Sequence, residues 1–162
     1  MKRKITIFSK LYWPEGSGAE LAVHLICKIL KKYFDITVVS GTSKPRNLPA
    51  RYIYWPLLRE KYKPIEQMKL FINSSMFKKL TRNSDVIYIP SHTLFPIAFI
   101  VKRICPEKKV VVHLHNYQPI SFTSVVFYDD SLSDFARSIK FEIFENGSSF
   151  KVVTSSFMSL FN

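Results

Sequence analysis

The sequence predicts an α/β protein with a doubly wound, mostly parallel sheet of about six strands and helices on both faces. Short β-branched runs alternate along the chain with longer segments of helical periodicity. The opening strand, helix and strand fall within residues 4–40, which is the spacing of a βαβ unit. A chain of 162 residues, 47% of them hydrophobic, suffices for a single domain, 1–162, with a substantial core.

The strands are short, β-branched runs that end at glycine, proline or polar residues. They are expected at 4–9, 36–40, 51–55, 85–89, 109–114 and 150–154. The fifth run is the most apolar, so we expect it near the centre of the sheet.

Apolar residues at spacings of three and four predict the helices. The first begins at Ser17 and continues to Tyr33. A second begins at Pro64 and ends at Asn83, a third spans 94–103, and a fourth follows a capping-box pattern at Ser131. The cysteines, Cys27 and Cys105, each fall inside an apolar helical pattern, which indicates buried free thiols.

The charge is strongly positive and uneven. The formal net charge is +12, and residues 1–115 hold 21 Lys and Arg against 7 Asp and Glu. Such a basic body suggests an anionic partner: a nucleic acid, a membrane surface or a phosphorylated ligand. No apolar run is long enough for a membrane span, and residues 5–9 are too short for a signal-peptide core, so we expect a cytoplasmic protein.

Polar groups follow several predicted strands, where ligands bind in doubly wound sheets. The segment after the first strand is Pro14-Glu15-Gly16-Ser17-Gly18-Ala19-Glu20, which leads into a helix. Backbone N–H groups at such a helix start can face an anion, although a plain strand-to-helix turn is the alternative. The other polar strand ends carry Ser40-Gly41, Ser91-His92 and His115-Asn116.

Two common nucleotide fingerprints are absent. A dinucleotide loop would need a third small residue where the chain has Leu21, and an acidic residue near the second strand end, where it has Ser40. No Gly-Lys-Ser/Thr follows the glycines, which excludes a Walker loop. No zinc-type Cys/His spacing is present, so we expect no bound metal.

Histidine supplies the candidate for chemistry. His115 comes just past the most apolar strand and could donate to a hydroxyl or phosphate, or move a proton near neutral pH. A surface or merely supporting histidine is the competing interpretation, and His113 on the same side of the strand shares the candidacy. His24 faces away from the apolar stripe and is predicted to be a surface residue, whereas His92 is intermediate.

Residues 59–82 are basic and aromatic. Arg59, Lys69 and Arg82 are among seven cations interleaved with Phe71 and Phe77. A basic amphipathic helix of this kind can lie on an anionic bilayer, which would make the protein peripheral at the inner face of the membrane. The alternative is an ordinary helix that covers the sheet and exposes its Lys/Arg face.

The chain resembles the N-terminal domain of GT-B-fold glycosyltransferases of the retaining family 4, a Rossmann-like domain. The resemblance spans nearly the whole chain through five motifs in order. They are the Pro14–Glu20 loop, the helix and Thr-Val-Val segment at 25–40, the strand and turn at 85–92, the strand and histidine at 110–116, and the Val-hydrophobic-Ser strand at 151–157.

The resemblance implies transfer of a sugar from a nucleotide-sugar donor, which is a substrate, without a metal or other cofactor. It places Gly16, Ser17 and Gly18 near the donor diphosphate, implies substrate-binding roles for Glu20, His92 and Asn116, and puts His115 near the reacting sugar. Asn116 stands where the family often has Asp, and Ser17 replaces the second glycine of the usual pair.

The family binds most of the donor in a C-terminal domain with a basic pair and a Glu-x7-Glu motif. These 162 residues contain no such motif. We therefore expect an acceptor-binding half that is inactive alone and needs a C-terminal donor domain or a separate polypeptide. The acceptor class stays open among lipid-linked, phosphorylated and glycan molecules. The alternative is a non-catalytic basic module that binds nucleic acid or another polyanion, although no RNA- or DNA-binding motif supports it.

Overall fold

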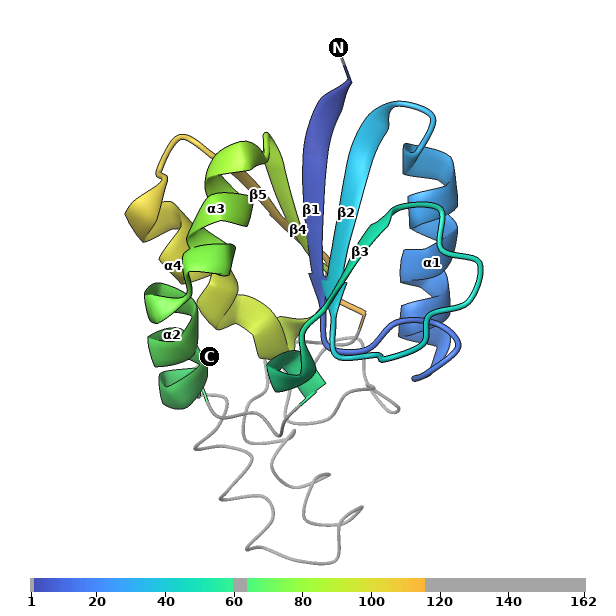
Figure 1. Cartoon of the computed structure of the whole chain (residues 1–162), viewed down its shortest axis with the longest axis horizontal. Coiled ribbons are helices and arrows are strands. Elements are labelled where there is room, and N and C mark those ends of the chain that lie inside the picture. The colour runs from blue at the N-terminus through green and yellow to red at the C-terminus, as the bar shows by residue number, and fades with distance from the viewer. Residues whose placement is uncertain (1, 60–63, 116–162) are drawn as a thin grey trace, which may run out of the picture. The chain divides into compact units, whose positions relative to one another are not determined.

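The computed structural model describes residues 2–59 and 64–115, without the side chains of 64–67. Met1–His113 forms one compact unit and Leu114–Asn162 a second. The first unit holds a five-stranded, all-parallel sheet with the order β3-β2-β1-β4-β5, flanked by helices (Figure 1). The fold class predicted from the sequence is therefore confirmed, with five strands in the described part of the chain.

The strands are β1 (Arg3–Ser9), β2 (Phe34–Ser40), β3 (Arg51–Tyr54), β4 (Val86–Ile89) and β5 (Lys109–Val112). Their registers put the amino ends together and the carboxyl ends together: Arg3 pairs with Phe34, and Ser9 with Ser40. We call these two sides the amino end and the carboxyl end of the sheet. The sixth predicted strand, 150–154, and the helix expected after Ser131 lie outside the described residues.

Helices cover both faces of the sheet, as Figure 1 shows. Helix α1 (Gly18–Leu30) packs on one face through Val23 and Cys27, against Ile7 and Val38 of the central strands. The other face is covered by α2 (Pro64–Asn73), α3 (Ser75–Asn83) and α4 (Phe95–Ile104). Its core includes Phe8, Phe77, Ile89, Ile97 and Ile100. Continuous burial on two faces explains why these strands are apolar throughout their carboxyl halves.

The fifth strand is not central in the described sheet. β5 pairs with β4 alone among the described strands, and its residues alternate between exposed and half-buried. Apolar content predicted a central position because buried parallel strands are continuously apolar. Valine is also favoured in a strand with one half-exposed face, so composition alone did not distinguish the two positions.

The segment 64–83 forms two helices rather than one. The break falls at Ser74, whose Oγ accepts a hydrogen bond of 3.1 Å from the Phe77 N–H and so caps α3. A side chain that satisfies a helix-start N–H favours a new N-terminus over continuation of the helix. Phe71 and Phe77, 3% and 0% exposed, both pack into the core.

His24 is buried rather than on the surface. Its ring is packed edge-on against Tyr12, and Nδ1 lies 3.2 Å from the Tyr12 hydroxyl. The surface prediction was wrong because the spacing of apolar residues in α1 does not show that Tyr12, from the preceding loop, packs against His24. Cys27 and Cys105 are buried free thiols, as predicted.

Short 3₁₀ turns follow two strands. η1 (Pro56–Arg59) follows β3, and η2 (His92–Leu94) follows β4 and leads into α4. Among the described residues, no helix is long and apolar enough to cross a membrane.

Candidate functional site

The strand order places a topological switch between β1 and β4. The chain leaves β1 toward β2 and β3 on one side, and then returns to place β4 on the other side of β1. Loops that leave the carboxyl ends of the two switch strands diverge, and this divergence creates the usual ligand crevice of doubly wound folds. The loop after β1 runs into the glycine segment, and the one after β4 carries Ser91 and His92.

The glycine segment lies at the start of α1. Gly16 has a positive φ of 97°, a conformation that side-chain-bearing residues rarely adopt. Ser17 is the extended N-cap, and a side chain at Gly18 would meet no atom within 4 Å. Gly16, Ser17 and Gly18 are exposed. The first-turn N–H groups of a helix have no partner within the helix, so this helix start offers donors beside open space.

Glu20 turns back onto the same helix start. One carboxylate oxygen accepts hydrogen bonds from the Ser17 N–H (2.6 Å) and the Ser17 Oγ (3.1 Å). A carboxylate at this end of a helix is favoured by the helix dipole. A Cβ at residue 16 would lie 2.4 Å from this carboxylate, which would have to shift, and the positive φ of Gly16 itself favours glycine. A phosphate bound at this helix start would therefore approach from the Gly18 side.

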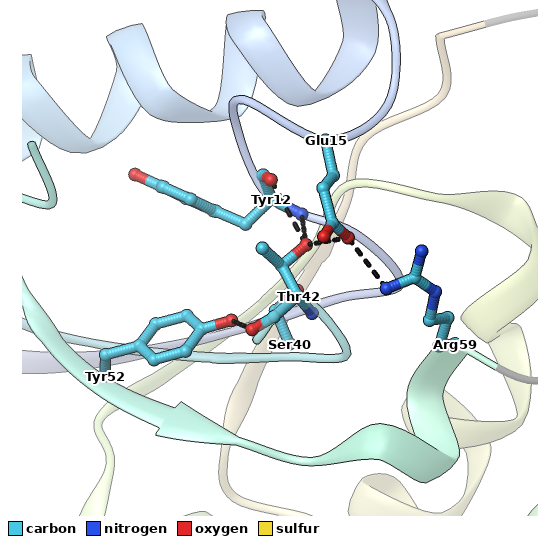
Figure 2. Close-up of polar contacts among 6 residues, drawn as sticks. All are labelled: Tyr12, Glu15, Ser40, Thr42, Tyr52 and Arg59. Carbon is cyan, nitrogen blue, oxygen red and sulfur yellow. Dashed lines mark hydrogen bonds and ion pairs between the residues drawn. The ribbon is translucent and has the colours of Figure 1, made fainter. Parts of the chain in front are cut away.

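Thr42, just after β2, joins two loops at the carboxyl end of the sheet (Figure 2). Its fully buried Oγ1 accepts a 2.8 Å hydrogen bond from the Tyr12 N–H. The same oxygen lies 3.1 Å from Glu15 Oε2 and 3.2 Å from the Tyr12 carbonyl, so its one proton is shared between two acceptors. We call the residues drawn in Figure 2 the Thr42 cluster: Tyr12, Glu15, Ser40, Thr42, Tyr52 and Arg59.

The outer members of the Thr42 cluster tie in β3 and η1. The Tyr52 hydroxyl donates to the Thr42 carbonyl, and the Thr42 N–H donates to Ser40 Oγ at 3.3 Å. Burial raises the pKa of Tyr52 above its usual value, so this hydroxyl keeps its proton. At the solvent side, Arg59 Nη1 lies 3.0 Å from Glu15 Oε2. Glu15, the residue immediately before Gly16, is thus held by both Thr42 and Arg59.

Gly41 allows these loops to approach one another. A Cβ at this position would lie 2.7 Å from Arg59 Cβ and 2.9 Å from the Lys10 carbonyl oxygen. The Gly41 N–H donates to that same carbonyl at 3.1 Å. The Ser40-Gly41 strand end, singled out in the sequence as a polar ligand candidate, is therefore packed against its neighbours, and Ser40 is fully buried.

Tyr12 connects the Thr42 cluster to the core beneath α1. Burial, followed by the neighbouring Cys27, raises the pKa of its hydroxyl far above the usual value. Burial also raises the pKa of Cys27 to about 11, so the thiol stays protonated and unreactive at neutral pH. Burial, followed by Lys28, lowers the pKa of His24. A neutral His24 Nδ1 can then accept the Tyr12 hydroxyl proton.

Ser91 and His92 begin the short turn after β4. Ser91 Oγ lies 2.8 Å from Thr93 Oγ1 and accepts the Thr93 N–H at 3.3 Å. His92 is half-buried, and its carbonyl accepts the N–H of Phe95 at the start of α4. The Ser91 side chain caps and so fixes this turn. The half-buried His92 ring is a polar group of the turn that remains partly accessible.

The two histidines after β5 differ in their surroundings. His113 Nδ1 lies 2.6 Å from the Tyr88 hydroxyl, and the His113 N–H extends the ladder to β4 by donating to the Ile89 carbonyl at 2.8 Å. Burial raises the pKa of Tyr88 to about 12, so the Tyr88 hydroxyl keeps its proton at neutral pH. His115 is exposed and belongs to the second unit. Asn116 lies outside the described residues.

The described carboxyl end offers hydrogen-bond donors at the start of α1 and in the turn after β4. No group of three or more His, Cys, Asp or Glu residues that could hold a metal ion occurs within 2–59 and 64–115. The accessible groups are the exposed helix start and the His92 turn. Such groups can bind a phosphate or a hydroxyl-bearing ligand without a cofactor.

The sequence did not reveal the Thr42 cluster. Glu15 was noted only as part of the glycine motif, and Thr42 and Arg59 lie 27 and 44 positions after it. The one available signal was Gly41, because a glycine directly after a buried strand indicates a close backbone approach.

Comparison with protein-family models gives no match for this chain, and no curated protein matches it.

Proposed function

We propose that this chain is the acceptor-binding, N-terminal half of a GT-B glycosyltransferase that uses a nucleotide-sugar donor. Donor binding is assigned mainly to a C-terminal domain or a separate polypeptide. The proposed acceptor is a lipid-linked, phosphorylated or glycan molecule, and the proposed location is the cytoplasm, peripheral at the inner membrane face through residues 59–82. The reaction retains the sugar configuration and uses no metal.

The observation that carries the proposal is the exposed helix start at the topological switch. Gly16 at φ 97°, the capped Ser17 and the open space at Gly18 lie where the loop after β1 leads into α1, and β1 is the central strand of the order β3-β2-β1-β4-β5. This is where doubly wound folds bind anionic ligands. The Pro14–Glu20 motif that carries the family resemblance supplies these residues.

The proposed roles follow the resemblance residue by residue. Gly18 and the neighbouring N–H groups approach the diphosphate, and Glu20, whose carboxylate accepts the Ser17 N–H, contacts substrate at the same helix start. His92 and Asn116 contact substrate, and His115 contacts the reacting sugar. In this assignment the Thr42 cluster positions the loop through Glu15 and does not touch substrate.

The second candidate is a basic module without catalytic activity that binds nucleic acid or another polyanion. The net charge of +12 favours it. Binding of this kind weakens steeply with salt and depends little on sequence, because it rests on phosphate contacts. The glycosyltransferase proposal predicts instead a saturable dependence on one class of nucleotide sugar.

The deciding experiment measures sugar transfer from a panel of radiolabelled nucleotide sugars to total lipid and glycan extracts. It uses the complete gene product together with the polypeptides encoded beside it. We expect transfer from one donor class, loss of at least 100-fold in the His115→Ala variant, and no transfer by residues 1–162 alone. Lys28→Gln, an exposed change on α1, is the matched control and should retain activity. Activity of residues 1–162 alone, or salt-sensitive oligonucleotide binding with no transfer from any donor, would overturn the proposal.

A further inference from the structure

The amino end of the sheet has an unusual polar face. On the face of the sheet that α3 covers, Lys4 and Thr6 of β1 precede Phe8, which is buried in the core. On the same face, Asp35 and Thr37 of β2 precede the buried Val39. Strands buried on both faces are normally apolar along their length. Here the carboxyl half of each strand follows this rule and the amino half does not.

These residues line a groove of about 330 Å³ between the sheet and α3. β1 contributes Lys4, β3 contributes Arg51 and α3 contributes Lys79, and we call this feature the cationic groove. Ile53, Met76 and Leu80 supply apolar walls. The volume is at the lower limit of small-molecule sites, and a few polar groups on an apolar lining are their usual composition.

The side chains of the three cations are not paired with acids in the described part of the chain. Among the described residues, the side chains of Lys4, Arg51 and Lys79 make no ion pair or hydrogen bond. Asp35 is the acid that lines the groove, and although it pairs with Lys4 in the strand register, it forms no salt bridge with any of them. The lining therefore carries three positive charges and one negative charge.

A cation near the end of a helix has an ordinary explanation, since it stabilises the helix C-terminus. In α3 that explanation applies to Arg82 in the last turn, and not to Lys79 in the middle of the helix or to Lys4 and Arg51, which come from strands. The C-terminus of α3 carries about half a negative charge from the helix dipole and therefore repels an anion. This charge is small beside the net positive charge of the lining. Its carbonyls also have partners: Ser84 Oγ donates to the Leu80 carbonyl at 2.7 Å, and Lys108 Nζ donates to that of Arg82 at 2.9 Å.

The groove floor is fixed in shape. Thr6 and Ser84, 2% and 4% exposed, share a hydroxyl–hydroxyl hydrogen bond of 2.6 Å that joins β1 to the residue after α3. The Lys4 N–H donates to Asp85 Oδ2 at 2.7 Å on the same edge. A rigid floor in a groove lined by cations can bind a compact anion with little reorganisation.

We propose that the cationic groove binds a small phosphorylated ligand through Lys4, Arg51 and Lys79. This site is separate from the one in the proposed function, because it lies at the opposite ends of the strands. β1 has seven residues, so the two sites are separated by roughly 20 Å at about 3.3 Å per residue. The groove accommodates a phosphate and a small organic group, but not an extended polymer.

The test is a titration of the ¹⁵N-labelled 162-residue chain with pyrophosphate and with glucose 6-phosphate at low ionic strength. We expect saturable shifts of amides at 4–6, 35–37, 51–53 and 79–84. The Arg51→Gln/Lys79→Gln double variant should bind at least tenfold more weakly. Lys28→Gln/Lys32→Gln removes the same charge from exposed positions outside the groove lining, and should change affinity by less than twofold.

Three results would contradict the proposal. Binding that does not saturate, or that falls equally in the two double variants, would show an effect of net charge alone. Displacement of pyrophosphate from the groove by a random oligonucleotide, with shifts spread over the whole basic surface, would favour a nucleic-acid surface instead. The four substituted residues are all exposed, so both double variants should fold. Thermal midpoints equal to that of the wild type will confirm this.

Discussion

The two ends of the same sheet use their polar residues in opposite ways. At the carboxyl end, hydrogen bonds of the buried Thr42 join the loop after β1 to β2 and β3, and Glu15 is paired with Arg59 of η1. At the amino end, Lys4, Arg51 and Lys79 face a groove without ion pairs among the described residues. At the carboxyl end, the polar groups of the Thr42 cluster bind one another and position a loop. At the amino end, the charged side chains of the cationic groove form no such pairs among the described residues.

This difference separates residues that shape a site from residues that contact a ligand. The carboxyl end leaves the glycine helix start and the His92 turn accessible, and the Thr42 cluster holds Glu15, the residue before the glycine helix start. Mutations in the cluster should therefore act on stability, whereas mutations in the cationic groove should act on binding with little effect on stability. Four substitutions, two in the Thr42 cluster and two at residues next to it, test the first half of that statement.

Gly41→Ala should have the largest effect. The added Cβ would lie 2.7–2.9 Å from Arg59 and the Lys10 carbonyl, and relief requires loops to move apart. We expect a loss of about 3 kcal/mol in the free energy of unfolding, measured by urea denaturation. Gly18→Ala is the matched control: its Cβ meets nothing within 4 Å, and alanine favours a helix by up to about 1 kcal/mol. Equal effects of the two changes would contradict the packing described for Gly41.

Thr42→Val should be next. It keeps the side-chain shape but leaves the Tyr12 N–H without its acceptor, and an unsatisfied buried donor costs about 2 kcal/mol. Thr37→Val is the control, since the half-buried Thr37 hydroxyl has no hydrogen bond among the described residues. If both variants unfold at the same urea concentration, Thr42 does not hold the loops together.

Arg59→Gln should cost less than about 1 kcal/mol. The Arg59 side chain is 55% exposed, and exposed ion pairs contribute little because water and salt screen them. The small difference from the wild type should shrink further in 0.5 M salt. A loss that is large and independent of salt would mean that Arg59 contributes by packing and not by its charge.

His24 should lower the stability of the fold under acidic conditions. Its folded-state pKa is below the ordinary 6.5, so the unfolded chain binds the extra proton more readily. Stability is then retained above pH 6.5 and lost as the pH falls below it. Thermal unfolding of the wild type and of His24→Gln at pH 7.5 and pH 5.5 measures the difference. The variant should lose less stability on acidification, and an identical loss would exclude His24 as a source.

Periodicity in the sequence located most of the fold, because strands of this sheet are short β-branched runs with polar ends. The starts and ends of β1, β2 and β4 fell within two residues of the predicted ranges. The sequence did not predict the helix break at Ser74, because apolar residues recur at helical spacing through residues 65–80. The break depends on a hydrogen bond from the Phe77 N–H to the Ser74 side chain, which this spacing does not show.

Tertiary contacts explain what the sequence could not reveal about the sites. Burial of His24 depends on Tyr12, which enters from a loop twelve positions earlier. The Thr42 cluster and the cationic groove each join residues from three or more elements. The exposed glycine helix start could be predicted because all its parts are contiguous in residues 14–20.

Transfer activity of a Gly18→Leu variant tests the central claim most directly. The variant is made in the complete gene product, and leucine adds bulk to open space in front of the first-turn N–H groups. If a diphosphate approaches this helix start, the variant should fold with an unchanged thermal midpoint and lose at least 100-fold in transfer from the nucleotide sugar. Full activity in the folded variant would contradict the assignment of the glycine segment to substrate.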